Sequence, residues 1–396
     1  MGDSPRNTIG SSERIVSVKL GERSYDIIVR TGLLRSLGAD IARLTKGPLV
    51  GIVTDQHVAR HYLKEVGRSL RREGLEPIPI VLRSGERSKT LNTVRAILDS
   101  LAEHRFERQS LMLALGGGVV GDLAGFAAAI YHRGISFVQV PTSLVAQVDS
   151  SVGGKTGVDH RLGKNLIGAF HQPRTVLIDP DTLRTLPQRE LRAGMAEIIK
   201  YGVIADEEFF AFLEDAMPAL LNLDAEMVLR TIARCCEIKA QIVGEDERES
   251  DRRRVLNYGH TIGHALESLG GYRQLIHGEA VGIGLVQEAD LARQMGLCKP
   301  EVVERIKTLV GRAGLSDRMP DMSFSSLWGA MQHDKKVIGG QVMGVWPLRI
   351  GEVVIRPLEK PVCADWYRRR RERTAFRSNR RQEKVTPVRR SATMTR

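Results

Sequence analysis

The order of short apolar runs is the feature that most constrains this chain. Between residues 14 and 178, β-branched or apolar runs alternate with amphipathic stretches, an order typical of a parallel sheet covered by helices. The runs are Leu49–Val53, Ile78–Leu82, Leu111–Leu115, Phe137–Val140 and Val176–Ile178. The sequence therefore predicts a Rossmann-like α/β domain over residues 14–178, preceded by an N-terminal extension of residues 1–13.

The strand signal nearly vanishes after Asp179. Successive helical periods, bounded by prolines and glycines, predict an all-α second domain over residues 179–360. One more apolar segment, Gly344–Ile350 with Val353–Ile355, could form a hairpin or return to the first domain. The predicted fold is thus an α/β domain followed by a helical one.

Positive charge is concentrated at the C-terminal end. The 396 residues carry a net charge of +12, but residues 367–396 hold 12 of the 59 basic side chains and only two of the 47 acidic ones. The rest of the chain is therefore nearly neutral. A segment so rich in arginine and so poor in aliphatic side chains is predicted to be a disordered basic tail, because it buries too little apolar surface to offset chain entropy.

Neither a membrane protein nor a disulfide-stabilised protein is indicated. No apolar run approaches the roughly 20 residues that a membrane-spanning helix needs, and the first 15 residues lack the apolar core of a signal peptide. The four cysteines include the neighbours Cys235 and Cys236 and lack the spacing of a zinc knuckle. They are interpreted as reduced thiols of a cytoplasmic protein.

A glycine-rich turn follows the third of the apolar runs. Gly116, Gly118 and Gly121 match the pattern G-x-G-x-x-G between a predicted strand and a predicted helix, where backbone amides favour a pyrophosphate. A plain strand-to-helix turn is the alternative, since no acidic residue ends a strand about 20 residues later. If a dinucleotide binds, Asp55 or Glu86 is the candidate partner of its ribose.

A second glycine-rich loop covers residues 149–157 and is followed by Gly163, Lys164 and Asn165. It lacks the spacing of a P-loop. Its backbone amides, together with Lys155, Lys164 and Asn165, would suit an anionic group, whereas a solvated basic loop is the alternative. Both interpretations stay open at this point.

The strongest pattern is a stripe of four polar side chains at the spacing of one helix face. They are Asn257, His260, His264 and Glu267. Gly259 and Gly263 would each weaken such a helix by about 1 kcal/mol relative to alanine, which makes sense where something packs close to its backbone. Paired histidines beside a carboxylate, with His277 soon after, predict a metal site in which His260 and His264 are the simplest ligand pair.

Two single charges lie among apolar neighbours in the sequence. Lys239 stands at the edge of the apolar stripe of a predicted helix, where it either reaches solvent or meets a buried anion. Glu197 is also flanked by apolar residues, and a metal would compensate the cost of burying its carboxylate. Both positions add to the case for a site that holds a metal and an anion.

Taken together, these motifs resemble those of the 3-dehydroquinate synthase family, in the family's order, from about Arg14 to Arg356. The matching stretches are Ser84–Lys89, Gly116–Asp122, Pro141–Lys155, Gly163–Asn165, Gly194–Gly202, Asp246–Glu249, Asn257–Glu267, His277–Glu279 and His333–Lys336. The resemblance implies an NAD-binding α/β domain, a helical domain that carries a divalent metal, and a substrate cleft between them.

By the same resemblance, the metal ligands are Glu197, His260 and His277, which assigns His264 to the substrate. The positions expected to contact substrate are Arg133, Asp149, Lys155, Asn165, Lys239, Arg253, Asn257, His264 and Lys336. The positions expected to contact NAD are Asp55, Glu86, Lys89, Gly116, Gly117, Gly118, Asp122, Thr142 and Ser143. Three residues that depart from the family's usual choices, none of them a predicted ligand, are Asp251, Arg252 and Met343.

The implied reaction is a step of the shikimate pathway, in which 3-deoxy-D-arabino-heptulosonate 7-phosphate becomes 3-dehydroquinate and phosphate. In the family, NAD oxidises one hydroxyl, phosphate is eliminated, the hydride returns, and the ring opens and closes again by an aldol step. The expected cofactors are NAD and one zinc or cobalt ion, and the expected assembly is a homodimer.

Two alternatives remain open. Another NAD- and metal-dependent sugar-phosphate cyclase would alter the carboxylate-binding set Lys239, Arg253, Asn257 and His264, which this chain keeps. A nucleic-acid-binding protein would be built around the basic tail, but this tail lacks interleaved aromatic residues, so only non-specific contact with nucleic acid is expected.

Overall fold

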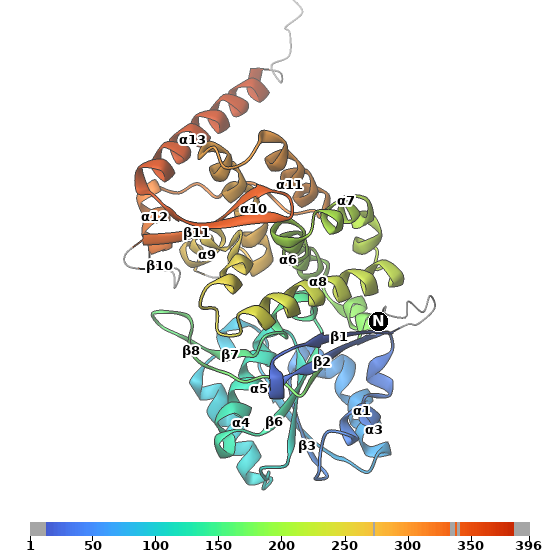
Figure 1. The fold of residues 1–396 in the computed structure, drawn as a ribbon. Helices are drawn as coiled ribbons and strands as arrows, with labels where there is room; N and C mark the ends of the chain where they lie inside the picture. Colours follow the sequence, from blue (N-terminus) through green and yellow to red (C-terminus); the bar gives the residue numbers. More distant parts are fainter. Residues whose placement is uncertain (1–12, 272–273, 333–336, 339–340, 384–396) are drawn as a thin grey trace, which may run out of the picture.

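The computed structural model describes residues 13–271, 274–332, 337–338 and 341–383, and it describes their side chains except at 337–338 and 374–383. A seven-stranded sheet of order β1-β2-β9-β6-β5-β3-β4 forms the centre of the N-terminal unit (Figure 1). All neighbours are parallel except β1 and β2. The strands are β1 (Glu13–Val18), β2 (Tyr25–Arg30), β3 (Leu49–Asp55), β4 (Glu76–Leu82), β5 (Leu111–Gly116), β6 (Ser136–Pro141) and β9 (Thr175–Ile178).

Helices cover both faces of this sheet, which explains why the central strands are continuous apolar runs. One face packs against α1 (Leu37–Ala42) and α3 (Lys64–Arg72). The other packs against α4 (Leu91–Glu103) and α5 (Gly118–Ile130). The predicted α/β fold is confirmed. Short helical turns complete this unit: η1 (Gly21–Arg23), η2 (Leu33–Arg35), α2 (Gln56–Val58), η3 (Ala59–Leu63), η4 (Glu86–Ser88) and η5 (Tyr131–Arg133).

The second glycine-rich loop leads into a hairpin that lies on α5. After η6 (Ala146–Ser150), β7 (Lys155–His160) pairs antiparallel with β8 (Gly163–Phe170). Gly125 of α5 permits the close approach, because a Cβ there would stand 2.4 Å from Cγ2 of Thr156. The basic residues of this segment are therefore fixed on a hairpin rather than carried on an open loop.

The helical unit follows β9 and packs above the sheet (Figure 1). Its large apolar core also includes side chains of β1 and β2, so the two units share a core. The small antiparallel sheet β10-β11-β12 lies against it, which makes the apolar segment near residue 344 a hairpin. The elements are η7 (Pro180–Thr185), α6 (Gln188–Ala205), α7 (Glu207–Leu221), α8 (Ala225–Glu245), η8 (Arg252–Asn257), α9 (His260–Leu269), α10 (His277–Gln294), α11 (Pro300–Arg312), α12 (Phe324–Gln332), β10 (Val337–Ile338), β11 (Gln341–Arg349) and β12 (Glu352–Leu358). No described helix has the length and apolar content needed to cross a membrane.

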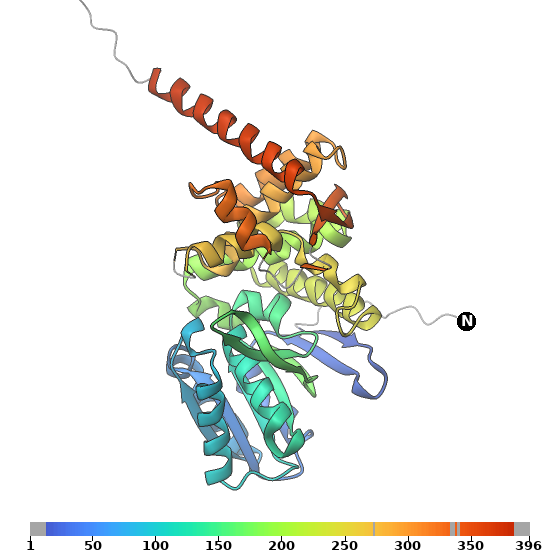
Figure 2. The same cartoon turned by 90° about the vertical axis from the view of Figure 1, so that its left-hand side faces the viewer.

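The predicted disorder from residue 367 is wrong for residues 367–383, because α13 (Lys360–Glu383) continues through them and projects from the helical unit (Figure 2). Trp366 is fully buried and Tyr367 is 5% exposed. The indole Nε1 of Trp366 donates to Oδ2 of Asp290 at 3.0 Å, and Arg373 pairs with the same carboxylate at 2.8 Å. Two buried aromatic side chains and the carboxylate of Asp290 thus hold α13 on the helical unit, although its composition alone indicated a disordered tail. Residues 384–396 lie outside the described part of the chain.

Truncation after Asp365 is expected to lower the midpoint of thermal unfolding by about 5 °C or more. Loss of one large buried aromatic side chain costs about 3–5 kcal/mol, and each kcal/mol shifts the midpoint of a 150–250-residue domain by about 2–4 °C. The matched control is truncation after Arg373, which keeps both aromatic residues and the contact with Asp290. Equal midpoints for the two truncated proteins would contradict the docking of α13.

Candidate active-site cleft and metal centre

A cleft of about 490 Å³ lies between the two units. The N-terminal unit contributes α5, η6 and the β7–β8 hairpin, and the helical unit contributes α6, α8, η8, α9 and the start of α10. Most of the residues that the sequence assigned to metal and substrate line this cleft, although they come from distant parts of the chain. They are Asp149, Lys155, Asn165, Lys239, Arg253, Asn257, His260, His264 and His277.

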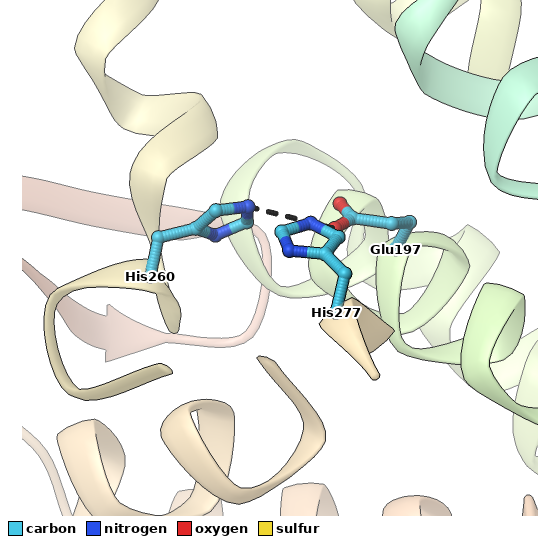
Figure 3. A group of neighbouring side chains, drawn as sticks. All are labelled: Glu197, His260 and His277. Atoms are coloured by element: carbon cyan, nitrogen blue, oxygen red, sulfur yellow. Dashed lines mark hydrogen bonds and ion pairs between the residues drawn. The ribbon is translucent and has the colours of Figure 1, made fainter. Parts of the chain in front are cut away.

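Three side chains from three helices converge at one wall of the cleft (Figure 3). Oε1 of Glu197, on α6, lies 3.1 Å from Nε2 of His277 and 3.5 Å from Nε2 of His260. One ligand atom from each residue can be chosen so that all three lie within 4.8 Å of one another. Two imidazole nitrogens and a carboxylate are the ligand types of a catalytic zinc site. Among the described residues, this grouping agrees with the ligand set implied by the resemblance.

Both histidines are oriented by hydrogen bonds at their other ring nitrogen. Nδ1 of His260 lies 3.0 Å from the carbonyl oxygen of Tyr258, and Nδ1 of His277 lies 3.1 Å from Oε2 of Glu267. When Nδ1 donates its proton in these bonds, each Nε2 presents its lone pair to the point between the three side chains. The residues therefore fit a divalent cation.

The electrostatics of this group also favour a cation. Burial acts to raise the pKa of Glu197. The ammonium of Lys200 and the ring of His260 outweigh this effect and hold the pKa well below its ordinary value. Burial acts to lower the pKa of His277, yet hydrogen bonds to Glu197 and Glu267 raise it to about 10. Burial lowers the pKa of His260. The carboxylates of Glu197 and Glu267 thus stabilise positive charge at His277, and a divalent cation can supply that charge in place of the proton.

The start of α9 is fixed by α10. Gly259 has a φ of +80° and caps α9, so the helix begins at His260 and Asn257 lies before it in η8. The four-residue helix face predicted from Asn257 to Glu267 is therefore wrong at its first position. Glu288 of α10 accepts hydrogen bonds from the backbone amides of Gly259 and Ile262, both at 2.8 Å. A Cβ on Gly259 would stand 2.7 Å from Leu285, so the expected close packing at this glycine is a helix–helix contact.

A buried ion cluster lies beside the metal group. Nζ of Lys239 stands 2.7 Å from Oδ1 of Asp149, and Oη of Tyr201 donates to the same oxygen at 2.6 Å. Nζ of Lys200 is 3.8 Å away. Burial lowers the pKa of Lys239 to about 8, with Asp149 opposing the change. Of the two alternatives for Lys239, the buried anion is therefore the correct one.

Arg253 is held in the cleft wall by backbone carbonyls. Its guanidinium donates to the carbonyl oxygens of Gly153 at 3.1 Å and Glu247 at 2.5 Å, and the residue is 1% exposed. Gly153 has a φ of +95°, and a Cβ there would stand 2.3 Å from Nη2 of Arg253. The carboxylate of Asp246 accepts from the backbone amides of Asp251 and Arg253, so Asp251 takes part in the turn that sets this arginine.

Residues assigned to NAD gather at one edge of the sheet. Asp55 ends β3, Gly116 ends β5, and Glu86 and Thr142 follow β4 and β6. The carboxyl ends of neighbouring parallel strands are the usual place for a dinucleotide in such sheets. A Cβ on Gly118, the first residue of α5, would stand 2.9 Å from Oγ of Ser150, so this glycine keeps the turn close to the cleft.

Other contacts at this edge join the assigned residues to one another. Lys89 is 5% exposed and its Nζ lies 2.5 Å from Oδ2 of Asp122, with Asn165 as a second partner. Asp55 accepts from the amides of His57 and Val58 and from Ser84. A Cβ on Gly117 would stand 3.3 Å from Oγ of Ser143.

Of the residues assigned to substrate, two are not brought to the cleft by the described part of the chain. Arg133 is exposed beyond the C-terminal end of α5 and does not line the cavity. Lys336 lies outside the described residues. Two charged residues that the assignment missed, Lys200 and Glu249, do line it. Both lie in stretches that match the family, Gly194–Gly202 and Asp246–Glu249, and Lys200 also stands three residues after Glu197 among apolar neighbours.

Comparisons with known proteins agree with this geometry. The chain matches the family models described as 3-dehydroquinate synthase N-terminal over residues 79–193 and C-terminal over residues 194–337. It is 48% identical over 344 residues to a 3-dehydroquinate synthase of Nostoc punctiforme, an alignment that covers 86% of this chain and 95% of that protein.

Two solved structures have the same architecture. The 2-epi-5-epi-valiolone synthase ValA from Streptomyces hygroscopicus, with NAD+ and Zn2+ bound, aligns with a TM-score of 0.82 and 28% identity over 90% of this chain and 99% of that one. A 2-deoxy-scyllo-inosose synthase complexed with carbaglucose-6-phosphate, NAD+ and Co2+ aligns with a TM-score of 0.81 and 25% identity over 88% and 98%. With two consecutive family models and a relative that is nearly half identical across most of its length, this chain belongs to the 3-dehydroquinate synthase family.

Proposed function

We propose that this protein is a 3-dehydroquinate synthase, which converts 3-deoxy-D-arabino-heptulosonate 7-phosphate to 3-dehydroquinate and phosphate. The observation that carries the proposal is the cleft, where a metal-competent group and buried cations lie together beside a glycine turn. The identity of 48% to an enzyme of this name supports the same activity.

Glu197, His260 and His277 would hold a zinc or cobalt ion, and the glycine turn at Gly116–Gly118, with Lys89 and Asp122, would face NAD. When bound, the ion makes a substrate hydroxyl more acidic, and NAD takes up and returns the hydride. The protein's own part is to fix the donors: Nδ1 of each histidine is engaged, so Nε2 is the nitrogen that would bind the ion. Related enzymes that bind NAD+ with Zn2+ or Co2+ support this choice.

The buried cations of the cleft would hold the anionic substrate. Lys239 and Arg253 are 5% and 1% exposed, so a phosphate or carboxylate that reaches them interacts with little screening by water. Asn257 and His264 line the same wall, and Lys155 and Asn165 face it from the hairpin. Asp149 keeps Lys239 in place until the substrate arrives. Substrate would thus bind between the two units.

We propose a homodimer on the basis of the family resemblance. We propose a cytoplasmic location on the basis of the four cysteines, which are all free in the structure. Light scattering on the purified protein measures the mass directly. A monomeric mass at the concentrations used for activity would contradict the assembly and leave the proposed reaction untouched.

The second candidate is another sugar-phosphate cyclase, one whose substrate lacks a carboxylate, since a 2-epi-5-epi-valiolone synthase and a 2-deoxy-scyllo-inosose synthase share the fold. Phosphate release is to be measured with the heptulosonate phosphate and with a seven-carbon ketose phosphate that lacks the carboxylate. We expect kcat/KM for the first to exceed that for the second by about 10³-fold or more, because buried polar groups left unpaired penalise the wrong substrate strongly. Faster release from the substrate without a carboxylate would favour the other cyclase class.

A further inference from the structure

Glu267 makes two contacts that the proposed reaction does not by itself explain. It lies on α9, 3% exposed, and its two oxygens face different partners. Oε2 contacts Nδ1 of His277 at 3.1 Å, and Oε1 contacts Nζ of Lys164 at 3.3 Å. One oxygen of this buried carboxylate contacts a proposed metal ligand of the helical unit, and the other contacts a lysine of the N-terminal unit. Glu267 therefore connects the two sides of the cleft.

Lys164 lies on β8, in the N-terminal unit, and pairs with two carboxylates. Besides Glu267, its Nζ lies 3.1 Å from Oε1 of Glu86, at the sheet edge assigned to NAD. The next residue, Asn165, contacts Lys89 at the same edge. A continuous line of polar contacts therefore runs from Glu86 through Lys164, Glu267 and His277 to Glu197.

We propose that Glu267 is the positioning residue of the metal centre, and that Lys164 fixes Glu267 from the other unit so that metal affinity depends on this contact across the cleft. Glu267 holds His277 in the tautomer whose Nε2 faces Glu197. Carboxylates in this position typically change metal affinity by about 10–100-fold when removed. Lys164 acts through Glu267, because its ammonium holds the second oxygen and limits rotation of the carboxylate. This inference rests on the proposed metal ligands Glu197, His260 and His277.

The test measures the zinc dissociation constant of the folded metal-free protein by competition with a chromophoric chelator. We expect Glu267→Ala to weaken zinc by about 10–100-fold and Glu267→Gln, which keeps an acceptor for Nδ1, to weaken it less. Visible absorption of the Co2+-loaded proteins reports coordination geometry and is expected to change in Glu267→Ala. Glu214→Gln, which removes a carboxylate paired with Arg305 away from the cleft, is the control and should bind zinc like the wild type.

Lys164→Met tests the contact across the cleft. We expect it to weaken zinc several-fold in the wild-type background and to have no further effect in Glu267→Ala, because the two residues act in series. An equal effect in both backgrounds, or none in either, would overturn the role of Lys164. The unfolding midpoint of each metal-free variant shows whether it is folded, and the isosteric Glu267→Gln keeps the test decisive if Glu267→Ala does not fold.

The outcomes separate this inference from the proposed function. Wild-type protein without stoichiometric zinc would overturn both. If the wild type and both Glu267 variants bind zinc with one affinity, only the positioning role fails. If Glu267→Gln loses zinc entirely while Glu197→Ala keeps it, the ion is held by the neighbouring group of His264, Glu267 and His277, and Glu267 is a ligand rather than a positioning residue.

Discussion

Replacement of any one of Glu197, His260 and His277 by alanine is expected to remove the stoichiometric metal and to reduce phosphate release to background. Each residue is one of the three proposed ligands, and each comes from a different helix, so each replacement removes a third of the protein's ligands to the ion. Metal is to be counted by elemental analysis after dialysis of the folded variants. Chelation of the wild-type protein should abolish turnover, and added zinc or cobalt should restore it.

His264→Ala is the matched control for these variants. His264 lies one helical turn after His260, and the two rings stand 5.2 Å apart, centre to centre. We expect this variant to retain its metal and to lose turnover through weaker contact with substrate. Loss of metal in His264→Ala together with full metal content in His277→Ala would contradict the proposed ligand set. The ligands would then be the two histidines of one helix, His260 and His264.

Lys239→Met is expected to lower kcat/KM by about 10–200-fold. A hydrogen bond to a charged group contributes about 1.5–3 kcal/mol, and each 1.4 kcal/mol corresponds to about a factor of ten. Methionine keeps the length and apolar character of the buried stem, so the loss isolates the ammonium. Lys46→Met, at an exposed position of the N-terminal unit, is the control and should leave kcat/KM unchanged.

The same lysine gives a pH dependence with a defined sign. Because burial lowers the pKa of Lys239 to about 8, its ammonium is lost as the pH rises through that value in the free enzyme. We expect kcat/KM of the wild type to fall above about pH 8, since kcat/KM reports groups of the free enzyme, and this alkaline decline to be absent in Lys239→Met. A variant with the wild-type kcat/KM and the wild-type alkaline decline would contradict the role of Lys239.

Much of the fold could be predicted because local periodicity and glycine placement suffice for it. The runs Leu111–Leu115 and Phe137–Val140 are strands covered on both faces, and such strands leave a continuous apolar signature. Composition was a poorer guide at the C-terminal end. The arginines from 368 onward indicate a solvated segment, whereas Trp366 and Tyr367 just before them are buried and fix α13 on the helical unit.

The residues of the metal site could be predicted only in part from their spacing in the sequence. The spacing of His260 and His264 favours a pair on one helix, but His277 arrives from the start of α10 and Glu197 from α6, and no periodicity reports that convergence. The family resemblance supplied the set that the structure brings together. The contacts of Lys164 and Glu267 depend on the placement of the β7–β8 hairpin against α9, which the glycine-rich loop did not reveal.

The most direct test of the central claim is the stoichiometry of NAD in turnover. The zinc-loaded protein is to be incubated with the heptulosonate phosphate and about one-tenth as much NAD, while phosphate and the absorbance of NADH are followed together. We expect complete conversion with no accumulation of NADH, because the hydride is taken up and returned in the same cleft. Phosphate release that stops when the NAD is used up, with an equal amount of NADH formed, would contradict the assignment.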